Sequence, residues 1–198
     1  MPRVVDHGQR RGEIAGALWR IAAAEGLEAV SLARVAAEAG VSKGRVQHYF
    51  GSRDELLEFA AGQLKLRIDE RIRAAVVAAD PAGPIAVVRA LLVALLPLDD
   101  EARTDARVGS AFLIRALADD GLRATYRAGN HLLHDAVTTE LDHAVAAGEL
   151  PDGLDTGREA TVLTALAGGL GESLLIGDTS ETEAMAVLDH QLDHLRRS

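Results

Sequence analysis

The sequence contains no cysteine and few aromatic residues, and each absence excludes a class of structure. Without cysteine, the 198-residue chain can form neither disulfides nor thiolate metal sites. Aromatic residues make up only 3% of the chain, and it lacks the alternating runs of β-branched and aromatic residues that are typical of strands. Alanine-rich segments with helical periodicity stand in their place, so we predict an all-α protein.

Long hydrophobic runs are missing as well. Glycine, proline or charged residues interrupt every apolar run well short of the roughly 20 residues that span a bilayer, and the first 16 residues lack the apolar core of a signal peptide. With 48% hydrophobic residues, the chain can still bury a core. These features, together with the lack of cysteine, predict a soluble cytoplasmic protein without a membrane partner.

The motifs of common catalytic sites are also missing. There is no G-x-S-x-G nucleophile elbow, phosphate-binding loop or dinucleotide glycine pattern. His131 and His134 are three residues apart, and His190 and His194 are four apart, so either pair could share a helix face as metal ligands. Neither pair has an identifiable third ligand, and paired histidines on a charged helix are usually solvated. We therefore predict no enzyme activity, no metal and no cofactor.

Charge is divided unevenly along the chain. Residues 1–53 hold eight Lys and Arg against five Asp and Glu, a net charge of +3, which leaves −12 for the remainder. Basic segments favour nucleic acids or anionic surfaces, whereas an acidic body is repelled by polyanions. The charge distribution therefore predicts that the two parts have different tasks.

Three short helices are predicted in the basic part. The first ends at Gly26, where glycine can adopt the left-handed conformation that follows a helix, and its apolar residues share one face: Ile14, Leu18, Ile21 and Ala22. Ser31 is placed to cap a second helix that ends at Gly40. The apolar face of this second helix contains Leu32, Val35, Ala36 and Ala39.

Ser42 is placed to cap a third helix over residues 43–50 after a turn of three or four residues. A helix, a glycine-containing turn of this length and a second short helix form a helix-turn-helix motif, whose second helix enters the DNA major groove. Val46 and Phe50 share one side of the third helix and would dock it. The opposite side is polar and carries Gly44, Arg45 and His48, flanked by Gln47 and Tyr49.

The polar side of the third helix has the chemistry to bind DNA. Arg45 can donate two hydrogen bonds to guanine, and Gln47 can pair in the same way with adenine. Lys43 near the helix start can neutralise a phosphate, and Gly44 lets the backbone approach DNA closely. The alternative from the pattern alone is a short polar helix that is merely solvated.

Residues 26–57, GLEAVSLARVAAEAGVSKGRVQHYFGSRDELL, resemble the DNA-binding domain of the TetR family of transcriptional regulators. The resemblance includes the spaced Ile14, Leu18 and Gly26, and the GRVQHYFGSRDELL run is similar to the BetI-like branch. It implies a helix-turn-helix domain over residues 1–51 and a helical effector-binding and dimerisation domain over residues 52–198. It also implies three partners: a DNA operator, a small-molecule effector and a second copy of the chain.

The resemblance places DNA contacts at Ser31, Ser42, Lys43, Gly44, Gln47, His48, Tyr49 and Arg53. Many members have an aromatic residue where this chain has Gln47 and a small residue where it has Arg45, so the base preference should differ. We predict that Arg45 and Gln47 read bases and that Lys43, Tyr49 and Arg53 hold phosphates. Arg3, Arg10 and Arg11 are either further phosphate or minor-groove contacts or part of a solvated arm.

A long helix and five further helices are predicted beyond the basic part. Ser52 and Glu55 fit a capping box that opens a helix of about 25 residues, long enough to connect two domains. Breaks rich in glycine, proline and aspartate separate the remaining helices, the last of which begins with a second capping box at Ser180 and Glu183. The prediction is about nine helices in all.

The middle helices, expected at residues 85–96, 104–118 and 122–147, supply side chains that could line an apolar effector cavity: Leu91, Leu95, Phe112, Leu113, Leu117, Tyr126 and Leu133. Core packing is the alternative for each of them. The shortage of aromatic residues disfavours an aromatic cage for a quaternary ammonium ligand.

The last two predicted helices, residues 156–176 and 181–196, are candidates for a dimer interface. The first is apolar with small residues at AGGLG, and the second carries Met185, Leu188, Leu192 and Leu195 at helical spacing. In proteins similar to this chain, these two helices pair with their two-fold mates; packing within the chain is the alternative. The resulting expectation is a dimeric repressor that binds a palindromic operator and is released by an inducer. A helical adaptor without DNA binding is the rival interpretation.

Overall fold

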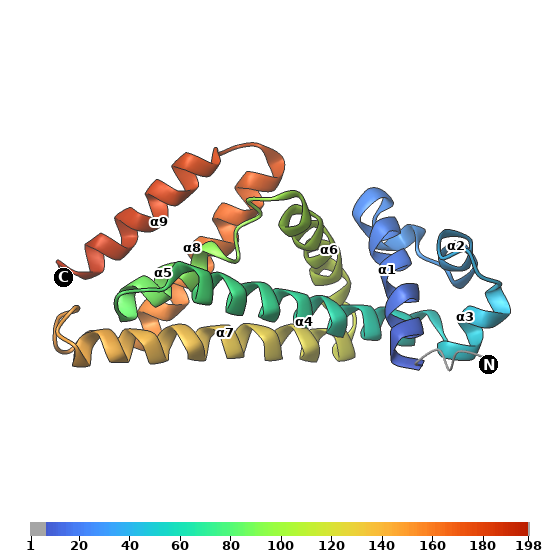
Figure 1. The fold of residues 1–198 in the computed structure, drawn as a ribbon, viewed down its shortest axis with the longest axis horizontal. Coiled ribbons are helices and arrows are strands. Elements are labelled where there is room, and N and C mark those ends of the chain that lie inside the picture. Colours follow the sequence, from blue (N-terminus) through green and yellow to red (C-terminus); the bar gives the residue numbers. More distant parts are fainter. Residues whose placement is uncertain (1–6, 198) are drawn as a thin grey trace. The chain divides into compact units, whose positions relative to one another are not determined.

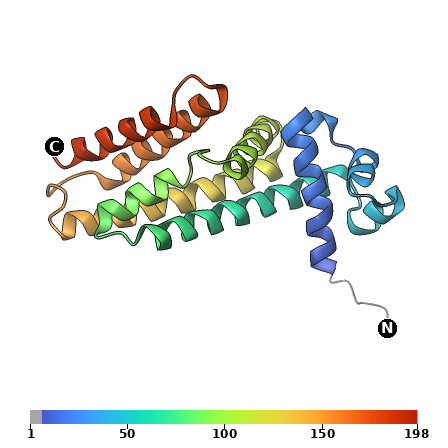
Figure 2. The same ribbon diagram turned by 45° about the horizontal axis from the view of Figure 1, so that its top comes forward.

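The computed structural model describes residues 7–197, and these residues form nine α-helices, one short 3-10 helix and no strand (Figures 1 and 2). The helices are α1 (His7–Glu25), η1 (Leu27–Ala29), α2 (Leu32–Glu38), α3 (Lys43–Tyr49), α4 (Arg53–Ala79), α5 (Pro84–Val93), α6 (Asp100–Ala116), α7 (Asp120–Ala146), α8 (Thr156–Ile176) and α9 (Glu181–Leu195). The prediction of an all-α protein is confirmed.

The described residues divide into two compact units. The N-terminal unit contains residues 7–67 and 107–126, and the C-terminal unit contains residues 68–106 and 127–197. Helices α4, α6 and α7 therefore contribute residues to both units. This division follows packing, whereas the predicted division after residue 51 concerns function and stays a prediction.

Glycine ends α1 and α2 as the sequence predicts. Gly26 has φ 81° and Gly40 has φ 65°, in the left-handed region that favours glycine. After α2, the N–H of Gly40 donates to the Ala37 carbonyl at 3.2 Å and that of Val41 donates to the Ala36 carbonyl at 2.9 Å. This pair of bonds is a Schellman motif, and it turns the chain sharply toward α3.

A capping box opens α4, with one difference from the prediction. The N–H of Glu55 donates to Ser52 Oγ at 3.0 Å, and Glu55 Oε2 accepts the N–H of Gly51 at 2.8 Å. The returning bond thus reaches the residue before the cap. Because the carboxylate holds the backbone at the joint between α3 and α4, the direction in which α4 leaves α3 is fixed locally.

Helix α6 begins four residues earlier than expected and α5 ends three residues earlier. Asp99 explains the first difference, because its Oδ1 accepts the N–H of Ala102 at 2.7 Å and so caps α6. Residues 94–98 form a short non-helical connection to it. The helices predicted at residues 156–176 and from 181 agree with α8 and α9 to within one residue.

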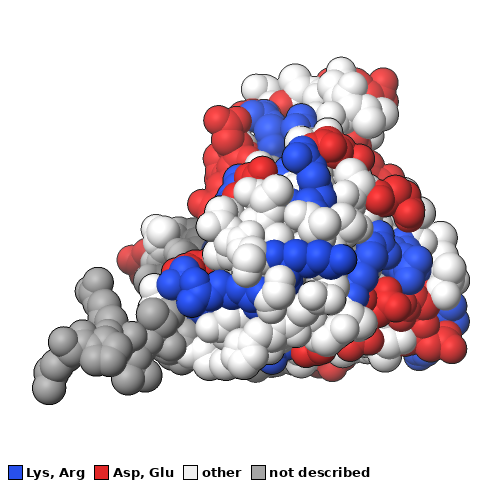
Figure 3. All heavy atoms as spheres, turned by 90° about the vertical axis from the view of Figure 1, so that its right-hand side faces the viewer, with Lys and Arg blue, Asp and Glu red and all other residues white. Residues whose placement is uncertain are grey.

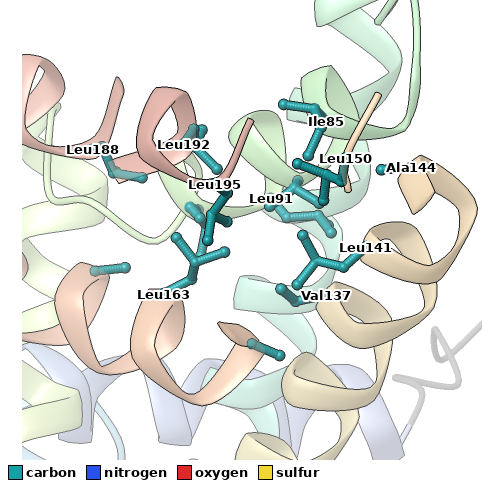
Figure 4. Packing of buried hydrophobic residues seen from close by; sticks show 14 of the residues in the cluster. Ile85, Leu91, Val137, Leu141, Ala144, Leu150, Leu163, Leu188, Leu192 and Leu195 are labelled. Carbon is teal, nitrogen blue, oxygen red and sulfur yellow. The ribbon is translucent and has the colours of Figure 1, made fainter. Parts of the chain in front are cut away.

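The core of the C-terminal unit joins α5, α7, α8 and α9 (Figure 4). Leu188, Leu192 and Leu195 of α9 point into it and are at most 3% exposed, while Met185 packs against it half-buried. Leu188, Leu192 and Leu195 therefore pack within the chain, which is the alternative that the sequence left open for them, and a dimer interface through the last two helices stays a prediction. The helical spacing of these residues alone could not distinguish burial within the chain from burial against a second copy.

Candidate nucleic-acid interface

Helix α3 is held by its apolar side and by its two ends. Val46 and Phe50 are fully buried, as predicted for the residues that dock it. At the start, Ser42 Oγ accepts the N–H of Arg45 at 3.2 Å, and at the end the N–H of Phe50 donates to the Val46 carbonyl at 2.9 Å. Helices α2 and α3 pack against each other, as in the predicted helix-turn-helix motif.

The outward side of α3 is polar and exposed. Lys43, Gly44, Arg45, Gln47 and His48 are all exposed, and within residues 7–197 neither the Lys43 ammonium nor the Arg45 guanidinium has an ion-pair partner. Figure 3 looks onto the end at which α1 to α3 are drawn, and it shows Lys and Arg side chains across this face, with Asp and Glu mostly toward its margins. Unpaired cations on an exposed helix are available to bind phosphates or bases.

The arginines of α1 and α2 are already paired. Arg34 on α2 donates to Glu25 Oε1 at 2.6 Å, and Arg20 on α1 donates to Glu38 Oε1 at 2.7 Å. The hydrogen bond to Glu25 raises the pKa of Arg34 above its usual range. Among the Lys and Arg residues of α1 to α3, only Lys43 and Arg45 therefore lack an ion-pair partner within residues 7–197.

Both predicted serine contacts are N-caps. Ser31 Oγ accepts the N–H of Arg34 at 3.1 Å, as Ser42 Oγ does for Arg45. A serine that caps a helix through its oxygen lone pairs keeps its hydroxyl hydrogen, which can be donated to a phosphate. The caps therefore leave both serines able to make the predicted contacts.

Tyr49 is half-buried and lies between two imidazole rings. Its ring centroid is 4.8 Å from that of His7 and 5.2 Å from that of His48. His7 is the first residue of α1, 41 positions before His48 in the sequence, and no local pattern connects the two. The sequence predicted His48 and Tyr49 as contacts but missed His7 beside them.

Arg53 has a structural role that the sequence did not predict. Its Nε donates to the Val30 carbonyl and its Nη2 to the Leu27 carbonyl, both at 2.7 Å. These bonds satisfy backbone oxygens around η1 and tie that loop to the first turn of α4. Because two of its donors are committed in this way, its predicted role in binding phosphate rests on the remaining N–H groups.

Arg10 and Arg11 are not part of an extended arm. Both are in α1, where Arg10 forms an ion pair with Glu13 and Arg11 donates to Glu55 Oε1 at 3.2 Å. The Arg11 guanidinium also lies 4.6 Å from the ring centre of Phe50 and 4.5 Å from that of Phe59. The interpretation of these two residues as a solvated arm is wrong, and Arg3 lies outside the described residues.

The predicted effector residues do not gather at one place within a unit. Leu91 is buried in the C-terminal core, and Leu95 and Leu133 pack against that core half-buried. The other four belong to the N-terminal unit: Phe112 is buried, Tyr126 is half-buried, and Leu113 and Leu117 are exposed. Their role as ligand contacts stays a prediction.

A small surface pocket of the C-terminal unit lies between α4 and α5. Its volume is about 230 Å³, and its lining is Ala75, Ala79, Pro81, Ala86, Arg89, Ala90 and Val93. Arg89 is held at its edge by Asp189, whose carboxylate accepts from Nε at 2.5 Å and from Nη2 at 3.1 Å. Pockets that enclose a small-molecule ligand usually measure about 300–1,000 Å³, so this pocket does not replace the predicted effector region.

The histidines outside the N-terminal unit have other surroundings. His134 Nε2 lies 3.1 Å from the Gly157 carbonyl and 3.2 Å from Thr161 Oγ1, which ties α7 to α8. His190 and His194 are exposed on α9. Over residues 7–197, no three His, Cys, Asp or Glu side chains are grouped as metal ligands would be.

Helix α8 combines high hydropathy with low burial. Its mean hydropathy of 1.3 over 18 residues makes it, within the described part of the chain, the one helix apolar and long enough to span a membrane, yet only 17% of that window is buried. Ala160, Leu163, Ala167 and Gly171 face the core. The opposite side exposes Val162, Gly168, Gly169 and Ile176.

Two family models match the chain. One, described as bacterial regulatory proteins of the tetR family, covers residues 14–60 and therefore contains α2, α3 and the start of α4. The other, described as the C-terminal part of BetI-type transcriptional repressors, covers residues 84–197, more than half of the chain. Together the two matches include both the exposed face of α3 and the apolar α8.

Individual relatives agree with these models. The chain is 36% identical over 112 residues to the transcriptional regulator PksA of Bacillus subtilis, which is 57% of this chain and about half, 54%, of that protein. It is 29% identical over 185 residues to the transcriptional regulator BetI of Paraburkholderia phymatum, with 93% of this chain and 91% of that protein covered.

A solved structure shares the whole fold. A transcriptional regulator from Rhodococcus sp. Rha1 superposes with a TM-score of 0.82 at 26% identity, and the match covers 94% of this chain and 96% of the other. The helix-turn-helix geometry, the family models and these relatives agree. The chain is a DNA-binding transcriptional regulator, not an enzyme, and it belongs to the TetR family, near the BetI branch.

Proposed function

We propose that this regulator is a ligand-responsive repressor that binds a palindromic operator as a homodimer and is released by a small molecule. The observation that carries the proposal is the outward side of α3, where exposed Lys43 and Arg45 have no ion-pair partner among the described residues while Val46 and Phe50 anchor the helix. Such a helix presents its polar side as a rigid unit, and little side-chain packing is disturbed when DNA binds.

The proposed DNA contacts fall into two groups, those that read bases and those that hold phosphates. Arg45 and Gln47 are exposed in the middle of α3, where side chains of a recognition helix reach base edges, and both residue types can form paired hydrogen bonds with one base. Lys43, Tyr49, His48 and the two serine caps hold phosphates, Gly44 allows close approach, and Arg53 contributes through the donors that its loop carbonyls leave free.

The proposed dimer interface is the exposed side of α8 together with the adjoining surface of α9. Ile176 is 79% exposed, Val162 47% and Val187 38%, which is costly for an isolated chain in water. Nothing lies within 4 Å of the position that a Cβ would occupy on Gly168 or Gly169, so another helix could approach the backbone there. A two-fold pairing of this side would bury the exposed residues of both copies.

A two-fold dimer also accounts for a palindromic operator. Its two copies of α3 would enter successive major grooves about 34 Å apart, so the half-sites would be inverted repeats. The sign of regulation is proposed from the description of the C-terminal match, which is that of a repressor. The charge division predicted for the chain fits a cytoplasmic protein in which the basic N-terminal part binds DNA and the acidic remainder does not.

Release by an inducer requires that the ligand bind the DNA-free conformation more tightly than the DNA-bound one. The proposed contacts remain the seven apolar residues predicted for the effector region, with a ligand that is small and mostly apolar. By linkage, DNA and inducer must weaken each other by the same factor. An effector with equal affinity for free and operator-bound protein would contradict this part of the proposal.

The first test is to mix the full chain with fragmented genomic DNA of its source organism and to sequence the retained fragments. An enriched inverted repeat is the expected result, and the gene beside it indicates the chemical class of the inducer. The best fragment is then titrated at increasing salt. The affinity should fall steeply, with a slope of about 0.9 for each phosphate that the protein neutralises.

Two controls make the outcome decisive. Arg45→Ala should lose enrichment of the inverted repeat, whereas Arg73→Ala, a change at an exposed α4 residue of the C-terminal unit, should retain it. Equal, weak retention of all fragments by the wild-type chain would contradict the repressor and leave the adaptor interpretation.

A further inference from the structure

We propose that His7, His48 and Tyr49 form a proton-linked phosphate clamp, in which the two imidazoles take up protons when DNA binds. The clamp would make the affinity for DNA depend on pH near neutrality. This inference rests on the proposed binding of DNA by α3, and it adds to that surface His7, a residue of a different helix.

The three rings form one continuous cluster. The Tyr49 ring is tilted by 53° against that of His7 and stands at 76° to that of His48, at centroid distances of 4.8 Å and 5.2 Å. These are ordinary distances for attractive aromatic pairs. His7 and His48 are both exposed, so the cluster has a half-buried phenol at its centre and two imidazoles open to solvent.

The cluster places His7 on the surface that DNA would meet. His48 belongs to the outward side of α3, and Tyr49 lies on its flank as a predicted phosphate contact. Since His7 contacts Tyr49, a backbone phosphate held by the phenol hydroxyl would lie near both imidazoles. The clamp therefore extends the predicted interface from α3 to the first turn of α1.

Imidazole is the side chain that ordinarily changes charge between about pH 5 and pH 8. A phosphate beside it favours the protonated form, and the ring of Tyr49 adds a favourable face for the cation. Binding of DNA should therefore be accompanied by proton uptake. Because binding takes up protons, the affinity for DNA should increase as the pH falls. The additional affinity should be lost as the pH rises and the imidazoles in the complex lose their protons.

Among the described residues, the charged groups that flank the cluster on α1 and α3 do not supply the missing anion. On α1, Arg10 and Arg11 follow His7 by three and four residues, and they are paired with Glu13 and Glu55 respectively. On α3, Arg45 lies one turn before His48 without an ion-pair partner. Asp6 precedes His7 in the sequence and lies outside the described residues. Within the described part of the chain, the carboxylates near the clamp are thus already bound by arginine.

The test is calorimetry of the full chain with its enriched DNA fragment, at about pH 7 in two buffers of different ionisation enthalpy. The wild-type chain should take up protons on binding, and its affinity should be about three- to tenfold higher at pH 6 than at pH 8 for each imidazole that becomes charged. The salt dependence should also be steeper at the lower pH, by about 0.9 for each added phosphate contact.

Matched variants assign the protons. His7→Gln and His48→Gln should each remove part of the uptake. Tyr49→Phe should reduce it as well, because it removes the hydroxyl that holds the phosphate beside the two imidazoles. His131→Gln changes an exposed histidine of the C-terminal unit and should leave the uptake unchanged.

The outcomes separate this inference from the proposed function. Tight, sequence-specific binding without proton uptake would overturn the clamp and leave the repressor intact. Proton uptake that is undiminished in His7→Gln would remove His7 from the DNA-binding surface and so overturn the clamp as well. Failure to bind DNA at either pH would overturn the proposed function and the clamp with it.

Discussion

Helices α3 and α8 each have one side that is exposed within residues 7–197, but the two sides differ in chemistry. The outward side of α3 exposes charged and hydrogen-bonding groups, whereas that of α8 exposes valine, glycine and isoleucine. Exposed polar groups cost nothing in water and become useful when a polyanion arrives. Exposed apolar groups are unfavourable in water at all times, which favours a permanent partner. The outward side of α3 can therefore remain free until DNA binds, whereas we expect a second copy of the chain to cover the exposed side of α8.

The largest effect is expected from charge on the exposed side of α8. In the variant Val162→Asp with Ile176→Asp, a two-fold interface would contain four unpaired carboxylates, each costing several kcal/mol. The dimer dissociation constant should increase by at least about 1,000-fold. Light scattering at micromolar concentration should show monomers, and the operator affinity should fall with dimerisation.

Leu132→Asp is the matched control for that variant. Leu132 is 58% exposed on α7, which is not one of the two helices proposed for the interface, and the change should leave the dimer intact. A double α8 variant that remains dimeric would show that this side is covered in some other way. Thermal unfolding of the monomer should be little changed, because both substituted residues are exposed within the chain.

The next effect concerns base reading by α3. Arg45→Ala should weaken operator binding by about 1–3 kcal/mol and change the base preference at its contact, with little effect on unrelated DNA. Lys43→Ala should weaken binding to all sequences alike and reduce the salt slope by about 0.9. Competition binding over a library of operator variants measures both.

Arg20→Ala is the control for these two α3 variants. Because Arg20 is already paired with Glu38, its loss should change the affinity for DNA less than either of them. A Gln47→Ala variant that weakens all sequences equally would contradict the base-reading role of Gln47.

Arg53 distinguishes a structural arginine from one that binds DNA. Arg53→Met removes two donors and leaves the Leu27 and Val30 carbonyls without them, so the free energy of unfolding should fall by about 1–3 kcal/mol. Denaturant titration of the DNA-free chain measures this loss. Arg73→Met, at a side chain that is 66% exposed, is the control and should be neutral. Unchanged stability with reduced salt slope would instead assign Arg53 to phosphate alone.

The smallest effect compares the two units through their helix caps. Ser42→Ala and Ser180→Ala each remove a hydroxyl that accepts an N–H at 3.2 Å, and each should cost about 1 kcal/mol of stability. Only Ser42→Ala should also weaken DNA binding, because it loosens the start of α3. Equal losses of DNA affinity in both variants would show that the cap acts through overall stability.

Local signals were sufficient for most of the helical architecture. Ser31, Ser42 and Ser180 cap their helices, and Gly26 and Gly40 end theirs with positive φ, because these effects involve residues only a few positions apart. The docking of α3 by Val46 and Phe50 was predictable for the same reason. The long-range contacts were not predictable in this way. Arg11 contacts a residue 44 positions away, Arg53 contacts residues 23 and 26 positions away, and His7 contacts Tyr49, 42 positions away.

The sequence by itself determined the all-α fold class of this protein, the position of α3 and the residue types that face outward from this helix. These follow from periodicity, capping and side-chain chemistry, which operate over one or two helical turns. Only the tertiary structure decided which apolar faces remain exposed. It buried Leu188, Leu192 and Leu195 within the chain, left Val162 and Ile176 in solvent, turned Arg53 toward a loop, and brought His7 to Tyr49. Two apolar faces have the same periodicity in a sequence, and only the packing of distant helices determines which one is covered.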